Sequence, residues 1–256
     1  MCLLENIMEN NLEEIKNKVY DYFSNIEFAE EQHEYNYKSR KLDSVSNIVK
    51  NFYVPFNGSL IAGFVAKSRG LDREEVLLEW KLKGDSSALL GTKTHKFGEI
   101  IDINKEPNTA QEYAMIQFWK SIPEHIIPTF LELKMFHDGY GIAGTTDIIL
   151  YNTQTNKFIV GDYKTNENLH KNYKGQKMLT PFDSYLDTPL NRYKVQLSLY
   201  ELLFRQVGFE VESRKIIWLK QDGTFELFEV ESLVEPLVIF LEKKKKEKVI
   251  NKLKDC

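Results

Sequence analysis

The segment at residues 157–164, KFIVGDYK, has the composition of a short buried strand with charged residues at its exit. Side chains alternate between the two faces of a strand, so residues two apart point the same way. Asp162 and Lys164 therefore face one common place, while Tyr163 faces the opposite side. An earlier apolar segment, GTTDIIL, contains Asp147 and predicts a neighbouring strand. The sequence thus predicts two carboxylates and one ammonium at the ends of adjacent strands.

This combination of charged groups suits the hydrolysis of a phosphodiester with a divalent metal ion. Carboxylate oxygens are ligands that hard cations such as Mg²⁺ prefer in proteins. A bound cation supplies Lewis acidity and makes a water molecule more acidic. The lysine is placed to orient the attacking water or to help deprotonate it. We therefore interpret Asp147, Asp162 and Lys164 as a candidate catalytic centre.

The hydrophobic pattern predicts an α+β protein with a central mixed sheet flanked by helices. An antiparallel meander is expected in the middle of the chain and a hairpin near its end, because turn residues separate the apolar segments. A short edge strand is expected at residues 33–38. The other expected strands are 129–136, 141–151, 157–164, 213–219 and 224–230. The expected helices are 11–23, 43–52, 72–83, 85–103, 109–122, 189–207 and 233–256.

A break between two helices divides the N-terminal part from the rest. Gly84 is expected to end one helix, and Asp85 or Ser86 to cap the next. The sequence then predicts a helical region at residues 1–84 that packs on the core. The remaining expected units are the core at 85–231 and a basic C-terminal helix at 232–256.

The helix expected at residues 85–103 carries a histidine in a polar row. Thr92, His95 and Glu99 follow steps of three and four residues, which place them along one face of a helix. Gly98 lies close to this face, and a glycine inside a helix costs about 1 kcal/mol relative to alanine. It therefore indicates the close approach of another segment or a ligand. From the residues alone, His95 is a metal ligand or a buried structural histidine.

The chain is acidic overall, with 34 basic and 38 acidic residues and a net charge of −4. Any affinity for nucleic acid must therefore come from local patches. Residues 165–189 favour no helix or strand and alternate lysines with aromatic residues, so we expect a flexible loop that closes over a single strand of DNA. The lysine run at 243–246 is a second DNA contact or a solvated helix face.

The cysteine and hydropathy patterns indicate a cytoplasmic protein. Cys2 and Cys256 are the two cysteines, which argues against a disulfide framework and fits a reducing compartment. No apolar run reaches the roughly 18 residues of a membrane-spanning helix. We therefore expect no membrane partner.

Four motifs, in the order of a known family, resemble the RecB-like branch of the PD-(D/E)XK nuclease superfamily. They are GTKTHKFGE, GTTD, DYK and QLSLY. The resemblance covers approximately residues 35–230 and extends to mitochondrial genome-maintenance and phage exonucleases. Asp162 stands where the commoner family motif has glutamate, a replacement that this branch also uses. Some members hold an iron–sulfur cluster with four cysteines, which this chain cannot supply.

The resemblance implies a nuclease core with Mg²⁺ or Mn²⁺ and a set of site residues. The implied metal ligands are His95, Asp147, Asp162 and the backbone carbonyl of Tyr163. Lys164 is implied to position the attacking water. The candidate DNA-binding residues are Gln196, Tyr200, Tyr193, Arg192, Lys177 and Tyr173. Glu99 and Glu132 are candidates for a supporting role beside the ligands, with a direct ligand role or an ordinary charged surface position as the alternatives.

The expected function is that of a Mg²⁺-dependent exonuclease on single-stranded DNA, acting in replication, repair or recombination in a bacterial or phage-infected cell. A structure-specific or restriction-type endonuclease would share the whole site. A non-catalytic DNA-binding module would need a broken ligand set, and the ligand positions in this sequence are intact.

Overall fold

The middle of the chain forms the centre of the sheet. In the computed structural model, which describes residues 3–32 and 34–254, three strands form an antiparallel meander. They are β4 (Ile126–His137), β5 (Ile142–Asn152) and β6 (Lys157–Lys164). β5 is buried at almost every position because other elements cover both of its faces. The predicted meander is confirmed, with small shifts at the strand ends.

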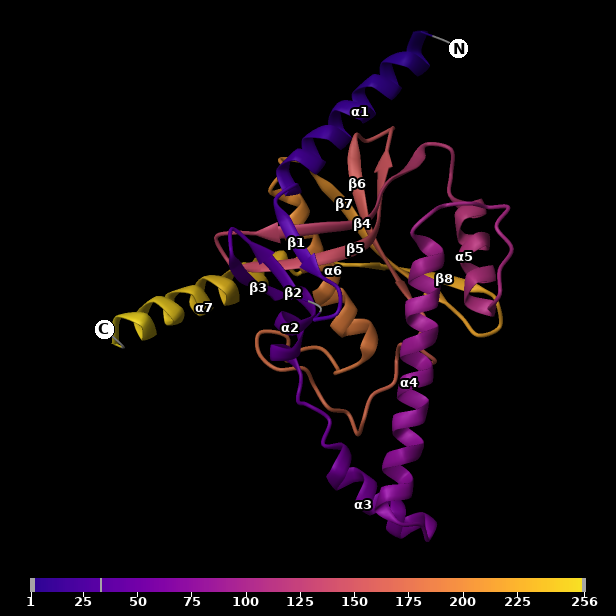
Figure 1. Cartoon of the computed structure of the whole chain (residues 1–256), viewed down its shortest axis with the longest axis vertical. Helices are drawn as coiled ribbons and strands as arrows, with labels where there is room; N and C mark the ends of the chain where they lie inside the picture. Colours follow the sequence, from indigo (N-terminus) through magenta and orange to yellow (C-terminus); the bar gives the residue numbers. More distant parts are fainter. Residues whose placement is uncertain (1–2, 33, 255–256) are drawn as a thin grey trace.

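Five more strands extend this meander into one mixed sheet of eight strands (Figure 1). They are β1 (Ile26–Ala29), β2 (Glu34–Tyr37), β3 (Arg40–Ser44), β7 (Val211–Leu219) and β8 (Phe225–Val230). The order is β1-β2-β3-β5-β6-β7-β8, and β4 pairs with β5 outside this path. β3 is parallel to β5 and β7 is parallel to β6, whereas the remaining pairs are antiparallel. The predicted α+β class and the β7–β8 hairpin are confirmed.

Three of these strands come from the N-terminal part of the chain, which we expected to be helical apart from one edge strand. β2 lies between β1 and β3 and is not an edge strand. The first residue of that expected strand, His33, lies outside the described residues. β3 starts with the exposed Arg40 and Lys41, so its apolar alternation is weak. Its pairing with β5, where Ser44 lies opposite Ala143, joins the segment to the core.

Helices cover both faces of the sheet and create two apolar cores. Ile149 and Val160 face the larger core, whereas their neighbours Ile148 and Ile159 face the smaller one. The smaller core lies against α5 (Ala110–Ser121). The helices of the larger core are α1 (Leu3–Phe23), α2 (Val45–Val49), which continues as the 3₁₀ turn η1 (Lys50–Phe52), α6 (Pro189–Arg205) and α7 (Val234–Lys254). The expected helices at these positions are confirmed, including the caps at Ser44 and Thr109.

Helix α4 (Arg73–Gly98) runs without a break through the position where we expected one helix to end. The prediction that Gly84 ends a helix and that Asp85 or Ser86 caps the next one is wrong. Glycine in a helix interior costs only about 1 kcal/mol, which the flanking helical residues can offset. The domain boundary that we placed at residue 84 therefore falls inside a continuous helix.

Both ends of α4 have clear local causes. A capping box of Asp72 and Glu75 satisfies the backbone at its start. The helix ends at Gly98, before the expected end at residue 103. A Cβ atom at Gly98 would lie 3.1 Å from Sδ of Met115 and 3.2 Å from Cε2 of Tyr163. This glycine therefore allows α4 to approach α5 and β6 closely, as expected for a glycine at this position.

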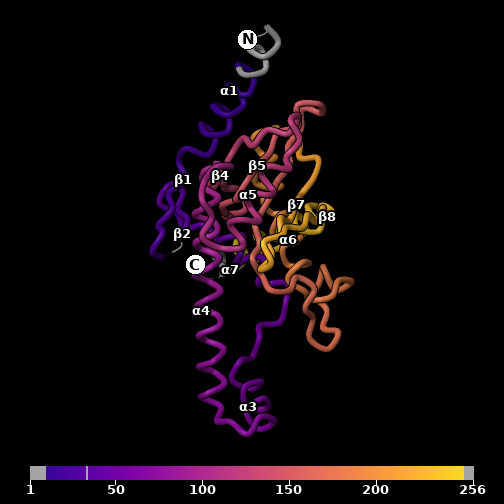
Figure 2. Tube along the Cα trace, turned by 90° about the vertical axis from the view of Figure 1, so that its right-hand side faces the viewer, coloured from indigo at the N-terminus to yellow at the C-terminus, as the bar shows by residue number. Residues whose placement is uncertain are grey.

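Helices α3 (Gly58–Arg69) and α4 form a hairpin arm that stands out from the rest of the molecule (Figures 1 and 2). Helix α3 is not among the helices expected from the sequence pattern. Asn57 caps its start, and Gly70 ends it with a φ of 66°, which glycine adopts without strain. The arm has its own small apolar contact around Ala62 and Val76. The arm is therefore a part of the N-terminal region that does not pack on the core, whereas α1, α2 and the strands before it do.

The loop at residues 165–188 contains no helix and no strand, apart from an isolated bridge between Lys177 and Leu186. It nevertheless follows a fixed path. Met178 and Phe182 are buried in the larger core. The backbone N–H of Leu179 donates a hydrogen bond of 2.7 Å to the carbonyl of Phe52. These contacts differ from the flexible, structureless excursion that we expected, because composition does not reveal which loop residues anchor on the core.

Within the described part of the chain, no helix combines the length and the apolar content needed to cross a membrane.

Candidate metal centre

Strands β5 and β6 bring the two predicted carboxylates together. Ile148 pairs with Gly161, and Asp147 and Asp162 occupy the next position on each strand. Both side chains are almost completely buried. Oδ2 of Asp147 accepts a hydrogen bond of 2.6 Å from the backbone N–H of Tyr163. The strand register thus places two acidic side chains from the two strands of one hairpin next to each other inside the protein.

The alternation expected at the end of β6 is confirmed. Nζ of Lys164 forms an ion pair with Oδ2 of Asp162, so these two side chains share one side. Within the described residues, this oxygen accepts no hydrogen bond of ordinary geometry, and its burial is compensated by the ion pair. Tyr163 points the other way, where its hydroxyl accepts a hydrogen bond of 3.0 Å from Nε1 of Trp119. Asp162 therefore carries an oxygen that a cation would stabilise further.

His95 reaches the carboxylates from α4. Its Nδ1 lies 3.1 Å from Oδ1 of Asp147. The side chain is 35% exposed, so it lies at the boundary between the sheet and the solvent. Thr92 and Glu99, from the same helix row, line the pocket that His95 lines. This position favours the ligand interpretation over that of a buried structural histidine.

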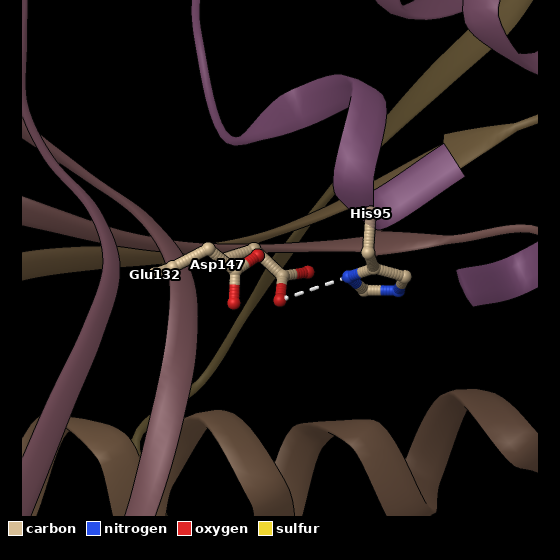
Figure 3. A group of neighbouring side chains, drawn as sticks. All are labelled: His95, Glu132 and Asp147. Atoms are coloured by element: carbon tan, nitrogen blue, oxygen red, sulfur yellow. Dashed lines mark ion pairs between the residues drawn. The ribbon is translucent and has the colours of Figure 1, made fainter. Parts of the chain in front are cut away.

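Glu132, from β4, completes a group of three side chains with the types and spacing of metal ligands. One nitrogen or oxygen of each of His95, Glu132 and Asp147 lies within 4.8 Å of the other two. Figure 3 shows Asp147 between the other two side chains. The φ of Glu132 is 47°, in the left-handed region that few residues other than glycine adopt. We expected a supporting role for Glu132, and the structure places it at ligand distance, with Asp162 beside the group.

Burial and the nearby charge of Asp147 raise the pKa values of two carboxyls. Burial, together with the charge of Asp147, raises the pKa of Asp162 to about 7. The same two causes raise the pKa of Glu132 to about 8. In the protein alone, both carboxyls therefore retain protons in a pH range where ordinary carboxyls have lost them. A cation at this place would stabilise the ionised carboxylates and so oppose the shift.

The pKa values of His95, Lys164 and Asp147 shift in the direction opposite to the one that burial alone would cause. Burial opposes the charged form of His95, but Asp147 outweighs it and raises the pKa of the imidazole to about 9. Burial also opposes the charge of Lys164, but Asp162 holds the pKa of this ammonium above its usual value. For Asp147, burial is outweighed by His95 and Lys164, and the pKa lies below its usual value. Lys164 is therefore an ammonium at neutral pH.

These groups line a pocket of about 1120 Å³ together with two residues of α6. Gln196 and Tyr200 are joined by a hydrogen bond of 2.8 Å from Nε2 to the phenol oxygen. A Cβ atom at Gly144 would lie only 2.8 Å from Cε1 of Tyr200. The absence of a side chain at this position therefore lets α6 approach β5. The histidine, carboxylate and glutamine–tyrosine motifs meet in this one pocket.

Two other candidate DNA-binding residues of α6 already have partners in the protein. Arg192 donates hydrogen bonds of 2.6 and 2.9 Å to the carboxylate of Asp187, and its guanidinium lies 3.7 Å from the ring centroid of Tyr53. Tyr193 donates a hydrogen bond of 2.7 Å to Oδ1 of Asn166. Neither residue lines the pocket of the carboxylates. Arg192 thus anchors the preceding loop, whereas the ring of Tyr193 also contacts the site, with Nζ of Lys164 4.3 Å from its centroid.

The loop candidates Tyr173 and Lys177 are exposed, and they too lie outside that pocket. Tyr185, another aromatic residue of this loop, is engaged by the protein. Its hydroxyl donates a hydrogen bond of 3.0 Å to Glu231, and Nζ of Lys194 lies 4.5 Å from the ring centroid. The loop thus offers fewer free aromatic rings than its composition suggested.

Sequence reasoning missed Tyr35, Lys96 and Lys134, which also line the pocket. Lys134 lies two positions after Glu132 on β4, but the left-handed backbone at Glu132 interrupts the alternation that would relate the two side chains. Lys96 follows His95 directly on α4 and carries no signal. Tyr35 comes from β2, and its hydroxyl lies 2.9 Å from Oγ1 of Thr145. Its place depends on the pairing of the N-terminal strands, which the sequence pattern does not reveal.

Comparison with known proteins adds little to this geometry. No family model and no curated protein matches the chain. One solved structure, described as "Crystal structure of SSO0001", aligns over 96% of this chain and 86% of its own, with 17% sequence identity and a TM-score of 0.36. A TM-score this low supports no inference about function.

Proposed function

We propose that this chain is a metal-dependent deoxyribonuclease of the PD-(D/E)XK type that hydrolyses phosphodiester bonds. The observation that carries the proposal is the meeting of Asp147, Asp162 and Lys164 with His95 in one pocket. Buried carboxylates, an imidazole and a lysine at adjacent strand ends form a donor set for a hard or borderline divalent cation beside a phosphate-binding ammonium. The resemblance of the four sequence motifs to RecB-like nucleases points to the same chemistry.

The donor set fits Mg²⁺ or Mn²⁺. The pocket lining contains five carboxylates and three lysines, so one divalent ion would balance these charges. The residues that would hold it are Asp147, Glu132 and His95, with Asp162 beside them. The raised pKa values of Asp162 and Glu132 show that the protein alone does not stabilise these anions fully. A bound ion would supply Lewis acidity and a more acidic water.

The chain's own residues then have separable tasks. Lys164 is charged at neutral pH because Asp162 raises its pKa, so it stabilises negative charge on the phosphate and does not act as a base. Asp162 holds the ammonium in place through the ion pair. Gln196 and Tyr200 present an amide and a phenol on the pocket wall, where they can donate to a DNA strand.

A single-stranded DNA end is the substrate that we favour. The motifs resemble those of exonucleases that act on single strands, and the exposed Tyr173 offers a ring for base stacking. A structure-specific or restriction-type endonuclease with the same site is the alternative. The two differ in one result, because an endonuclease cuts circular single-stranded DNA and an exonuclease does not.

The test is cleavage of end-labelled linear and circular single-stranded DNA with Mg²⁺ or Mn²⁺. We expect the wild-type chain to degrade the linear substrate, and Asp162→Asn and Lys164→Met each to reduce the rate at least about 100-fold. Asp85→Asn, on the exposed surface of α4, is the matched control and should retain the wild-type rate. Undiminished cleavage by Asp162→Asn, or full activity in EDTA, would contradict the proposal.

A further inference from the structure

A second cavity, of about 750 Å³, lies between β3, the turn from β4 to β5, and α7. Five of its lining side chains are basic, and they come from two parts of the chain that are far apart in sequence. They are Arg40, Lys41, Lys244, Lys245 and Lys248. Asp43 is the one acidic residue among the described residues that line this basic groove. The protein as a whole is acidic, so this concentration of positive charge is a local feature.

Among the described residues, three of these cations have acidic partners and two do not. Arg40 pairs with Asp138, Lys41 with Glu34, and Lys244 with Asp43 at 3.0 Å. The first two of these pairs are largely exposed, and such pairs contribute little and exchange readily with other anions.

Within the described residues, Lys245 and Lys248 form no ion pair, and both are exposed. Nζ of Lys245 lies 5.9 Å from the ring centroid of Tyr140, which lines the same groove. Glu242 faces this tyrosine from α7 and partly offsets the local charge. The groove thus combines free ammonium groups with a half-buried aromatic ring, as sites for nucleic-acid strands do.

Strand β5 connects this groove to the candidate metal centre. Ile142, at its start, lines the groove, and Asp147 lies five residues further on. At about 3.4 Å per residue, the two places are about 17 Å apart along the strand. A stacked nucleic-acid strand advances about 3.4 Å per nucleotide, so it covers this distance in about five nucleotides.

We propose that the basic groove binds the phosphate backbone of a nucleic-acid strand at a distance from the bond that is cleaved. The identity of the ligand rests on the proposed function. The groove binds phosphate groups and does not distinguish one base from another, because it offers ammonium groups and one aromatic ring. It holds strands that extend beyond the pocket, and it is out of reach of a substrate of about four nucleotides.

The test compares two double variants of α7 with equal change in charge. Lys245→Gln/Lys248→Gln removes the two unpaired ammonium groups, whereas Lys243→Gln/Lys246→Gln removes two charges from positions that do not line the groove. Binding of labelled single-stranded DNA of about twenty nucleotides is measured by fluorescence anisotropy in EDTA over a salt series. We expect the slope of log affinity against log salt to fall by about 1.4 in the groove variant, at about 0.7 for each lost phosphate contact. The control variant should keep the wild-type slope.

An unchanged slope in the groove variant overturns the inference, and so does an equal loss in the control variant. The result is independent of cleavage because the measurement contains no divalent ion. If the wild-type chain binds DNA through the groove but cleaves no substrate with Mg²⁺, the proposed function fails and the groove stands. If it cleaves DNA and both double variants bind like wild type, the groove fails and the proposed function stands.

Discussion

A divalent ion that binds at the candidate metal centre should displace about two protons at about pH 7. The pKa values of His95 and Glu132 are about 9 and about 8. Both groups are therefore mainly protonated at this pH, and each must lose its proton before its nitrogen or oxygen can bind a metal ion. Asp147 has a lowered pKa and is already ionised, so it contributes no proton.

The apparent affinity for the metal should depend steeply on pH. The logarithm of the binding constant rises by one per pH unit for each proton released. With two protons, the affinity should increase about 100-fold from about pH 6.5 to about 7.5. The increase should become shallow above about pH 9, where His95 has lost its proton in the metal-free protein.

Isothermal titration calorimetry with Mn²⁺, in two buffers of different ionisation enthalpy, measures the number of protons released. His95→Gln should release about one proton fewer than the wild-type chain, because the imidazolium is gone. Asp85→Asn, remote from the carboxylates, should release the wild-type number. No proton release at pH near 7, or equal release from His95→Gln and wild type, would refute the reasoning.

Three further predictions concern stability and binding. In EDTA the melting temperature should fall as the pH is raised from about 5 to about 9. The pKa values of Asp162, Glu132 and His95 are raised in the folded state, so the stability that their protonated forms contribute is lost as the pH rises through these pKa values. A melting temperature that rises over this range would contradict the assignment. Gly144→Ala should cost about 1–3 kcal/mol, because its Cβ would lie 2.8 Å from two neighbouring side chains, whereas Gly84→Ala meets no atom within 4 Å and should gain up to about 1 kcal/mol, both measured by denaturant unfolding. Tyr173→Ala should weaken binding of single-stranded DNA by about 1–3 kcal/mol. Tyr185→Ala should instead lower the melting temperature with little effect on affinity, because the hydroxyl of Tyr185 is hydrogen-bonded within the protein. Equal affinity losses in the two variants would contradict this difference.

The part of the site that depends on strand periodicity could be predicted from the sequence. Side chains two apart on β6 must share a face, so the contact of Asp162 with Lys164 follows from their spacing. The opposite direction of Tyr163 follows from the same rule. The antiparallel meander places Asp147 beside them because tight turns join its strands. Local rules were sufficient here because each partner is close in sequence or one hairpin away.

The role of Glu132 could not be predicted in the same way. Its backbone is in the left-handed region, so its side chain does not obey the alternation of a regular strand. Tyr35 escaped prediction for a different reason. The strands β1 to β3 are short and partly polar, and they join the core through the pairing of β3 with β5, a contact between distant parts of the chain.

The continuity of α4 through Gly84 could not be predicted from the sequence either. The pattern around Gly84 is typical of a helix end, and the cost of a glycine is too small to decide whether the helix stops. In the structure the helix continues, and this one element forms half of the arm and then presents His95 to the carboxylates.

Because α4 is continuous, the arm and the imidazole of His95 lie on the same helix, and their relative rotation is fixed by the number of residues between them. Each residue of an α-helix advances the axis by about 1.5 Å and turns it by about 100°. Loss of one residue between Gly84 and His95 would therefore swing the arm about a quarter turn around α4, whereas a flexible connection would absorb the change. The arm is also tethered through residues 53–57, which lead from η1 to α3, so it cannot turn freely. The length of α4 therefore sets the rotation of the arm relative to His95 about the helix axis. This length can change without disturbing His95 only in steps of about one helical turn.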